Sequence, residues 1–532
     1  MGQPKDILEQ NRLQIQMKLD AEKPQSERNR LGQFATPTPL ALDILQYAKN
    51  ILPDNIHLRF LDPAIGTGAF YSALNQVFPK KRITEAYGIE IDPSYGEEAT
   101  VLWKDTGIDV KITDFTSETP LPRFNLLICN PPYVRHHHLK NGYKLNLQTR
   151  TAEASGMRLS GLAGLYCHFI GLSHAWMAED CIAGWLIPSE FMDVNYGKSV
   201  KDYLLNKVTL LHIHRFDPSD KQFADALVSS AVVWFKKSPP PKNHSVVFSF
   251  GGSLLKPKIT RSVAAKDLFH VAKWTRLPKF DYSTNTSNPI LSDFFKIKRG
   301  IATGDNNFFI VDYKQIISDN LPIELFQPIL PSPRYLPENE ILSDKNGLPL
   351  INRQLFLFNT RLPENEIEQR FPALSSYLKY GKSLGIHERY ICRHRTPWYS
   401  QENRPPAPII CTYMGRVDVK GGRPFRFILN KSKATVANVY LAMYPSPLLK
   451  RAIDSDSKLI RKIWIMLNQI PSEQLLEEGR VYGGGLHKLE PKELSNVDAT
   501  AIANLIPDFK LNPKKRQVSL FNDFGDVAIN QV

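Results

Sequence analysis

The segment Asn130-Pro131-Pro132-Tyr133 combines hydrogen-bond acceptors with an aromatic ring. It follows the apolar run 124–129, and ligands of parallel sheets bind where strands end at the carboxyl edge. The prolines hold the turn rigid. The Asn130 side-chain oxygen and the Pro131 carbonyl can then accept hydrogen bonds from an amine, while Tyr133 faces a planar ring. This set suits an exocyclic amine on an aromatic ring; the alternative is a tight structural turn, which Asn-Pro often opens.

Three upstream strand ends carry groups that suit a nucleoside-containing cofactor. Gly66 and Gly68 lie in a turn between a strand and a helix start, where backbone N–H groups can approach a ligand closely. Glu90 ends the next strand, roughly 20 residues later, and can accept hydrogen bonds from ribose hydroxyls. Asp114 and Phe115 follow the third strand and can bind an adenine amino group and cover its ring. No one of these features is specific, but their order indicates such a cofactor.

The elements that position these residues are short strands alternating with helix-length segments. Runs rich in Val, Ile and Leu at this spacing predict βαβ units, and hence an α/β fold with a doubly wound, Rossmann-like sheet that is mixed but mostly parallel. The uncharged stretch 161–178 predicts a buried helix rather than a membrane span, because it contains histidines, a serine and several glycines. Strands are expected at Leu58–Leu61, Ala86–Ile91, Asp109–Thr113, Phe124–Cys129, Ala183–Ile187, Leu210–His214 and Ala231–Phe235.

Composition changes along the chain predict four segments. Residues 1–30 are polar and charged and read as a helical or flexible N-terminal arm, and residues 31–240 form the domain with the strand pattern. Three prolines at 239–241 make a stiff connector. Residues 244–511 lack the βα alternation and are expected to form a second domain, followed by a flexible polar tail at 512–532.

The net charge of +14 and the pI near 9.3 favour an acidic partner, above all nucleic acid. The alternative is a protein that is merely basic. With 42% hydrophobic and 23% charged residues, a disordered or collagen-like chain is excluded. The five cysteines are scattered without a C-x-x-C pair, which argues against a disulfide framework or a zinc module and fits a reducing cytoplasm. No signal peptide is visible in the charged first thirty residues.

Six motifs occur in order: Gly32–Pro37, Asp62–Gly68, Gly88–Glu90, Thr113–Phe115, Asn130–Tyr133 and Gly184–Pro188. Together they resemble the motifs of gamma-class adenine-N6 DNA methyltransferases of bacterial type II restriction–modification systems. The resemblance is strong over about residues 28–240 and weaker beyond. It implies a methyltransferase catalytic domain followed by a DNA target-recognition domain. Asn-Pro-Pro-Tyr alone is shared with enzymes that methylate RNA or protein glutamine, so it specifies the reaction but not the substrate.

The resemblance implies S-adenosylmethionine as the cofactor, and no metal. Ile65 departs from the family pattern, which often has cysteine there, but this position is not chemical. The implied cofactor contacts, from the methionine end to the adenine end, are Thr36, Pro37, Asp62, Ala64, Gly66, Gly68, Glu90, Ile91, Asp114, Phe115 and Phe169.

The resemblance also implies that an adenine flips out of double-stranded DNA to be methylated. Asn130 and Pro131 would hold its amino group, Pro132 would stiffen the turn and Tyr133 would stack on the base. Catalysis would come mainly from positioning and electrostatics. A further aromatic is expected on the opposite face of the base, where Phe223 is the best match and Phe216 competes.

Basic and aromatic residues are expected to contact the DNA, because guanidinium groups suit phosphates and guanine edges. For the aromatic-rich segment of the second domain, the alternative is a surface loop around a buried tryptophan. The expected DNA contacts are Arg135, Lys140, Arg299, Arg389, Arg393, Arg395 and Trp398.

The partners expected besides DNA are a separate cognate restriction endonuclease and, through residues 517–521, the replication sliding clamp. These residues resemble a short clamp-binding peptide. The implied location is the bacterial cytoplasm, near the nucleoid and without a membrane. The competing interpretations are an RNA or protein amide methyltransferase and a DNA-binding module that has lost catalysis.

Overall fold

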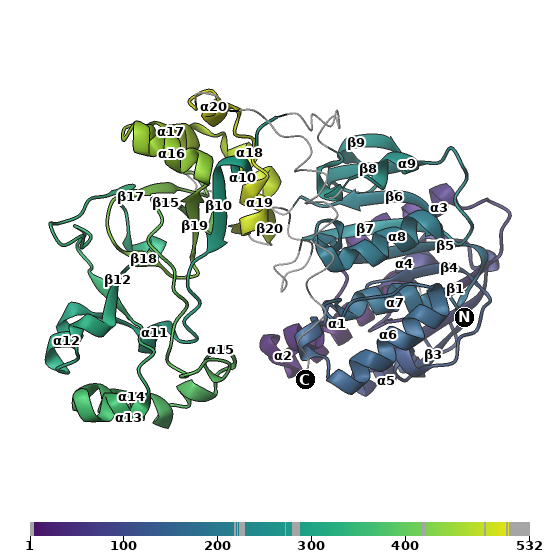
Figure 1. Cartoon of the computed structure of the whole chain (residues 1–532). Helices are drawn as coiled ribbons and strands as arrows, with labels where there is room; N and C mark the ends of the chain where they lie inside the picture. The colour runs from purple at the N-terminus through teal and green to yellow at the C-terminus, as the bar shows by residue number, and fades with distance from the viewer. Residues whose placement is uncertain are drawn as a thin grey trace. The chain divides into compact units, whose positions relative to one another are not determined.

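The computed structural model describes residues 5–217, 220, 222, 229–271, 273–278, 288–416, 422–482, 486–506 and 509. The chain divides into two compact units (Figure 1). The first comprises residues 1–283 with 482–484, and the second comprises residues 284–481 with 485–532.

A nine-stranded sheet forms the centre of the first unit, in the order β3-β2-β1-β4-β5-β7-β6-β8-β9. Strands β3 to β5 in this order are mutually parallel, and β7 runs antiparallel to both β5 and β6. Each strand expected from the apolar runs is present, so the doubly wound, mostly parallel fold is confirmed. The strands are β1 (Leu58–Asp62), β2 (Ile83–Glu90), β3 (Ile108–Ile112), β4 (Phe124–Cys129), β5 (Met177–Pro188), β6 (Thr209–Arg215), β7 (Ser230–Lys236), β8 (Ser245–Gly252) and β9 (Pro257–Ala264).

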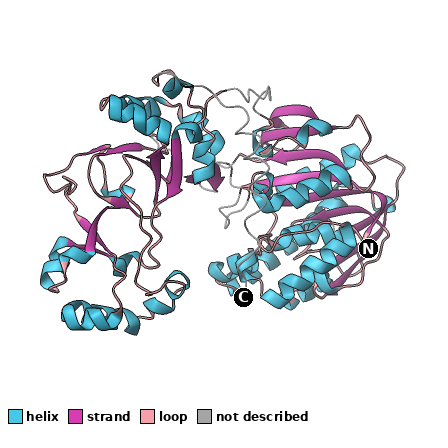
Figure 2. Ribbon diagram, in the orientation of Figure 1, coloured by secondary structure: helices cyan, strands magenta, loops and turns pink. Residues whose placement is uncertain are grey.

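Helices cover both faces of this sheet (Figure 2). Along the central strand β4, Leu126 belongs to a hydrophobic cluster with α3, α4 and α5, whereas Leu127 belongs to a second cluster with α6, α7 and α8. Strands buried on both faces must be apolar throughout, which is why β4 reads as a continuous apolar run. The expected buried helix is α7, and each of its residues is buried. The covering helices are α3 (Thr38–Ile51), α4 (Ala69–Val77), α5 (Pro93–Leu102), α6 (Asn141–Ser155), α7 (Leu165–Ser173) and α8 (Lys198–Asn206).

Two helices precede this core, α1 (Lys5–Glu22) and α2 (Gln25–Leu31). Helix α1 packs against α4 and α5, and it buries Arg12 and Leu19. The N-terminal segment therefore forms two helices that belong to the first unit.

Residues 239–241 connect β7 to β8, two strands of the same sheet. Ser249 on β8 hydrogen-bonds to His212 and His214 on β6, at 2.7 and 2.8 Å. The boundary expected at 240–244 thus falls inside the first unit, which continues to Ser283. Prolines break a strand, but a loop between strands accommodates them equally well, so the composition could not distinguish a connector from a turn. A short helix, α9 (Ala265–Leu268), follows β9.

The second unit has three small sheets among its described residues, in the orders β10-β19-β15-β17-β13, β11-β14-β12-β18 and β16-β21-β20. The strands are β10 (Phe295–Arg299), β11 (Ile310–Asp312), β12 (Phe326–Leu330), β13 (Glu340–Ile341), β14 (Leu355–Phe358), β15 (Ile409–Thr412), β16 (Met414–Arg416), β17 (Phe427–Asn430), β18 (Thr435–Val436), β19 (Tyr440–Pro445), β20 (Arg480–Tyr482) and β21 (Leu486–Lys488).

Separate hydrophobic clusters stabilise this unit, whereas the first unit has its core on the two faces of one sheet. The helices are α10 (Leu291–Phe294), α11 (Asn306–Phe309), α12 (Tyr313–Ser318), α13 (Glu364–Arg370), α14 (Pro372–Ser383), α15 (Tyr390–Arg393), α16 (Pro447–Ser455), α17 (Leu459–Gln469), α18 (Ser472–Glu478), α19 (Pro491–Ser495) and α20 (Thr500–Ala503).

The extent of the first unit can be tested by truncation. A chain ending at Ser283 keeps β8, β9 and the buried Trp274, whereas a chain ending at Pro240 leaves the β6 edge unpaired and prone to association. We expect the longer chain to be monomeric and to unfold cooperatively on heating, and the shorter chain to aggregate. Circular dichroism and light scattering measure both properties. Equal stability of the two chains would place the boundary at the prolines after all.

Candidate active site

The carboxyl ends of four neighbouring parallel strands bring the expected site residues to one edge of the sheet. Strand β1 ends at Asp62 and β2 ends at Glu90. Asp114 follows β3 closely, and Asn130 directly follows β4. Because these strands are adjacent and run in the same direction, residues from distant motifs meet at one place.

The glycine turn after β1 is held by the two buried acids. Gly66 N donates to Glu90 Oε2 at 2.9 Å, and Ala64 N donates to Asp62 Oδ1 at 3.1 Å. At Gly66 the backbone has φ +54°, and a Cβ built there would have no atom within 4 Å. The turn therefore leaves open space above Gly66 in which a ligand can approach the backbone. Gly68, by contrast, is required for packing, since a Cβ there would lie 2.3 Å from the indole nitrogen of Trp103.

The two acids at this edge are buried. Burial raises the pKa of the Asp62 carboxyl to about 8, and burial also raises the pKa of Glu90 above its ordinary value. Asp62 Oδ2 has no hydrogen-bond partner within the described part of the chain. A buried acceptor of this kind favours a ligand that brings a donor or a positive charge.

The Asn130 amide is oriented by the segment around Thr36. Its Nδ2 donates to Phe34 O at 2.9 Å and to Thr36 Oγ1 at 3.1 Å. Its Oδ1 is buried and has no hydrogen-bond partner among the described residues. Since an unpaired buried acceptor is costly, the site is built to receive a donor at this oxygen.

Tyr133 is fixed by backbone contacts on both sides. Its hydroxyl donates to Leu186 O at 3.0 Å, and its backbone N–H donates to Gly32 O at 3.3 Å. The ring is 8% exposed and lies 5.5 Å from the Phe34 ring. The Gly32–Pro37 segment therefore lies directly against the Asn130–Tyr133 turn. A side chain at Gly32 is excluded, because its Cβ would come within 2.3 Å of Tyr133 N.

At the other end of the site, Asp114 accepts hydrogen bonds from Thr116 N at 2.9 Å and Thr116 Oγ1 at 2.8 Å. The Tyr143 hydroxyl on α6 donates to Asp114 Oδ2 at 3.3 Å. Phe115 and Phe169 are buried with their rings 5.0 Å apart. The structure thus brings both phenylalanines together beside Asp114, although they come from distant segments.

The remaining expected site residues differ in their burial and in whether the structure describes them. Thr36 is buried, Pro37 is the residue before α3, and Ile91 is 64% exposed just after Glu90. Phe223 lies outside the described residues, as does the expected clamp peptide 517–521. The competing Phe216 is buried and packs 4.7 Å from the His214 ring.

The residues expected to contact DNA differ in how far their side chains are engaged in contacts within the protein. Arg135, Lys140 and Arg393 are exposed, and Arg393 lies over the ring of Tyr390, itself 71% exposed. The guanidinium of Arg299 also lies 4.1 Å from a tyrosine ring centre, that of Tyr413.

The other three are engaged within the second unit. Arg395 donates to Ala302 O at 2.7 Å, to Thr303 O at 3.0 Å and to Gln401 Oε1 at 2.8 Å. Arg389 forms an ion pair with Asp305, and Trp398 stacks on Phe308 and donates to Glu364. Sequence reasoning could not foresee these contacts, because they depend on which loops meet.

Within the described residues, no group of three or more His, Cys, Asp or Glu side chains could hold a metal ion. The five cysteines are buried and free of disulfides. Among the helices that the structure describes, none combines the length and apolar character of a membrane span.

A doubly wound sheet with a glycine turn, an acid at the next strand end and an Asn-Pro-Pro-Tyr turn defines a methyltransferase. The model of the Eco57I restriction-modification methylase family matches residues 79–223. A second model, for the C-terminal domain of the type II methyltransferase M.Eco57I, matches residues 281–519. Between them, the two models match the chain to restriction–modification methyltransferases on both sides of the unit boundary, as the order of its motifs had indicated.

Relatives extend the similarity over nearly the whole chain. The type II methyltransferase M.AccI of Acinetobacter calcoaceticus is 27% identical over 95% of this chain and 93% of that protein. M.XamI of Xanthomonas campestris pv. amaranthicola is 26% identical over 90% of this chain and 86% of its own length. The solved structure of the type IIL restriction-modification enzyme MmeI in complex with DNA shares the fold. Its TM-score is 0.52 at 12% identity, over 92% of this chain and 70% of that one.

Proposed function

We propose that this protein transfers the methyl group of S-adenosylmethionine to the N6 amino group of a flipped-out adenine in double-stranded DNA. The observation that carries the proposal is the Asn130 Oδ1 beside the exit of β4, a buried acceptor to which none of the described residues donates. The type II methyltransferases among its relatives, the solved relative in complex with DNA and the net charge of +14 support DNA as the substrate. In a restriction–modification pair, this reaction would protect host DNA from a separate cognate endonuclease.

The residues at the sheet edge fit S-adenosylmethionine. Asp62 Oδ2, a buried acceptor with no hydrogen-bond partner in the part of the chain that the structure describes, suits its positively charged methionine part, and Gly66 has open space above its backbone. Glu90 already accepts from Gly66 N and Asp92 N, but each carboxylate oxygen can accept more than one hydrogen bond, which leaves capacity for a ribose hydroxyl. Thr116 holds Asp114 beside the buried pair Phe115 and Phe169. This arrangement suits contacts to the adenine of the cofactor. When bound, the cofactor supplies an activated methyl group on a sulfonium.

The protein's own contribution is to hold the target amine. The two hydrogen bonds from Asn130 Nδ2 fix the amide so that Oδ1 remains the free acceptor. Hydrogen bonds from the adenine amino group to Asn130 Oδ1 and to the Pro131 carbonyl favour a pyramidal nitrogen with an available lone pair. That nitrogen would then be placed to attack the methyl group, with the methyl carbon–sulfur bond breaking and the neutral thioether leaving, and it would afterwards lose one proton to water. Positioning and fixed dipoles carry this chemistry, so no side chain has to act as a strong base.

The substrate is tested by incubating the protein with tritiated S-adenosylmethionine and plasmid DNA, RNA or bulk protein. We expect label only in DNA, at N6 of adenine within one short sequence, as mapped by mass spectrometry and sequencing. Label in RNA or protein would establish the competing substrate classes. Tight DNA binding without transfer to any substrate would identify a non-catalytic binding module.

Asn130→Ala should lower the methylation rate by about 10²–10³, the usual loss when one oriented polar group of a catalytic site is removed. Affinity for the cofactor should stay nearly unchanged, because Asn130 is assigned to the target amine. Asn125→Ala is the matched control, since Asn125 lies at the other end of β4 and bonds only to backbone near β1. Single-turnover kinetics and calorimetry measure the two effects. Retained turnover with lost cofactor affinity would contradict the assignment.

Cofactor affinity should increase with pH up to about 8. In the free protein, burial raises the pKa of Asp62 to about 8, so its carboxyl is protonated at neutral pH. A positively charged cofactor favours the ionised carboxylate and lowers this pKa, so binding must release a proton below pH 8. Affinity then rises by at most about tenfold per pH unit and levels off above that pKa. Calorimetry from pH 6 to 9 measures this. Asp62→Asn should remove most of the pH dependence of cofactor affinity. An affinity that falls as the pH rises would refute the role assigned to Asp62.

Arg393 and Arg395 should differ when each is replaced by Ala. Arg393 is exposed, so its loss should weaken DNA binding without changing thermal stability. Arg395 holds two backbone carbonyls, so its loss should lower the melting temperature as well. Binding to a fluorescent duplex and differential scanning calorimetry separate the two effects. Unchanged DNA affinity of Arg393→Ala would remove this patch from the recognition surface.

A further inference from the structure

Helix α1 packs against α4 and α5, and it also contacts the glycine turn through polar side chains. Arg12 lies near its middle and is 1% exposed. An arginine is rarely buried so completely, and only where its donors are satisfied by specific partners. Those partners show what the helix does.

The Arg12 guanidinium joins two segments of the active site. Its Nη1 donates to Thr67 Oγ1 at 3.2 Å, and its Nη2 donates to Thr38 Oγ1 at 3.2 Å. Thr67 lies between the two glycines of the turn, and Thr38 follows Pro37. Both segments are assigned above to the methionine end of the cofactor, so one planar group fixes their separation.

The charge of Arg12 is balanced within α1. Glu9 accepts from Arg12 Nε at 2.8 Å and from Nη2 at 2.6 Å. Burial acts to raise the pKa of Glu9, but hydrogen bonds from Arg12, Ser72 and Thr38 outweigh it and lower the pKa below its ordinary value. A buried ion pair contributes little net stability compared with an apolar pair of similar size. Positioning therefore explains this pair better than stability does.

Further residues of the N-terminal segment contact the motifs at the sheet edge, up to the acid assigned to the ribose. Gln16 Oε1 accepts from Thr67 Oγ1 at 2.7 Å. Further on, Lys23 forms an ion pair with Asp92, two residues after Glu90. The contacts of α1 and the turn after it thus follow the cofactor-binding motifs in their order along the proposed cofactor.

We propose that α1 is a positioning element of the cofactor site and that Arg12 is its principal positioning residue. By holding the glycine turn at a fixed distance from the Thr36–Thr38 segment, Arg12 sets the affinity for S-adenosylmethionine without touching it. This inference rests on the proposed function, because it requires that the cofactor binds at this edge.

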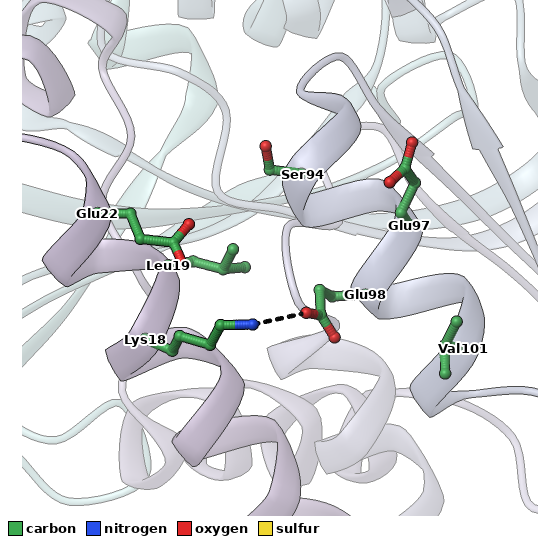
Figure 3. Close-up of a pocket in the computed structure, with 7 residues that line it drawn as sticks. All are labelled: Lys18, Leu19, Glu22, Ser94, Glu97, Glu98 and Val101. Carbon is green, nitrogen blue, oxygen red and sulfur yellow. Dashed lines mark hydrogen bonds and ion pairs between the residues drawn. The ribbon is translucent and has the colours of Figure 1, made fainter.

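A second contact of α1, with α5, offers a matched control. There Lys18 and Leu19 line a pocket of about 400 Å³ together with residues of α5 (Figure 3). Lys18 reaches Glu98 at 3.4 Å, and its side chain is 64% exposed. This ion pair joins α1 to α5 but involves none of the assigned cofactor contacts, so its loss tests packing of α1 alone.

The experiment compares the full-length chain with its Arg12→Met, Arg12→Lys and Lys18→Met variants. Calorimetry gives the dissociation constant for S-adenosylmethionine, and thermal unfolding without cofactor gives stability. We expect Arg12→Met to weaken cofactor binding by about tenfold or more, the loss of a charge-assisted hydrogen bond. KM for the cofactor should rise equally while kcat at saturation stays within about threefold, and Lys18→Met should bind like the wild type. A purely structural role would lower stability without this separation of KM from kcat.

Arg12→Lys covers the case in which Arg12→Met does not fold. Lysine keeps the charge beside Glu9 but lacks the planar fork that spans two hydroxyls, so stability should recover while cofactor affinity stays low. Wild-type affinity in any folded Arg12 variant, or equal losses in Arg12→Met and Lys18→Met, would overturn the inference. A wild-type protein that binds no S-adenosylmethionine would instead overturn the proposed function.

Discussion

The pair of hydrogen bonds from Asn130 Nδ2 to the Phe34–Thr36 segment is the contact on which the site depends. It joins positions 96 residues apart in the chain and leaves one amide oxygen buried, with no donor to it among the residues that the structure describes. The sheet makes this meeting possible, because parallel strands deliver their carboxyl ends to one edge. The backbone contact between Gly32 and Tyr133 lies beside it and joins the same two segments.

Around this contact, the site keeps its polar groups in a low-dielectric edge of the sheet. Asp62 and Glu90 are both buried, and burial raises the pKa of both carboxyls above their ordinary values. Such a site is poorly satisfied by water and well satisfied by a cationic ligand. The same burial strengthens every hydrogen bond made inside the site, which suits a reaction that depends on orientation rather than on a strong base.

The sequence allowed the sheet to be predicted almost completely, since strands covered on both faces must be apolar. The glycine turn, Glu90 and Asn130 were also predictable, because their residue types carry chemistry at the ends of those strands. The tertiary contacts that hold these residues in place could not be predicted from the sequence. Arg12 belongs to a polar segment that carries no motif, yet it is buried, and nothing in the pattern marks Tyr143 as the partner of Asp114. The proline run was read as a linker because a connector and a loop between strands have the same composition.

The described chemistry-bearing residues from Gly32 to Tyr133 lie within the first unit, while several candidate DNA contacts, including Arg299 and Arg393, lie in the second. The second unit has its own hydrophobic clusters. Under the proposed function, substitutions that change the DNA sequence recognised can therefore fall on loops and short strands of the second unit. The catalytic edge of the first unit would not have to change with them.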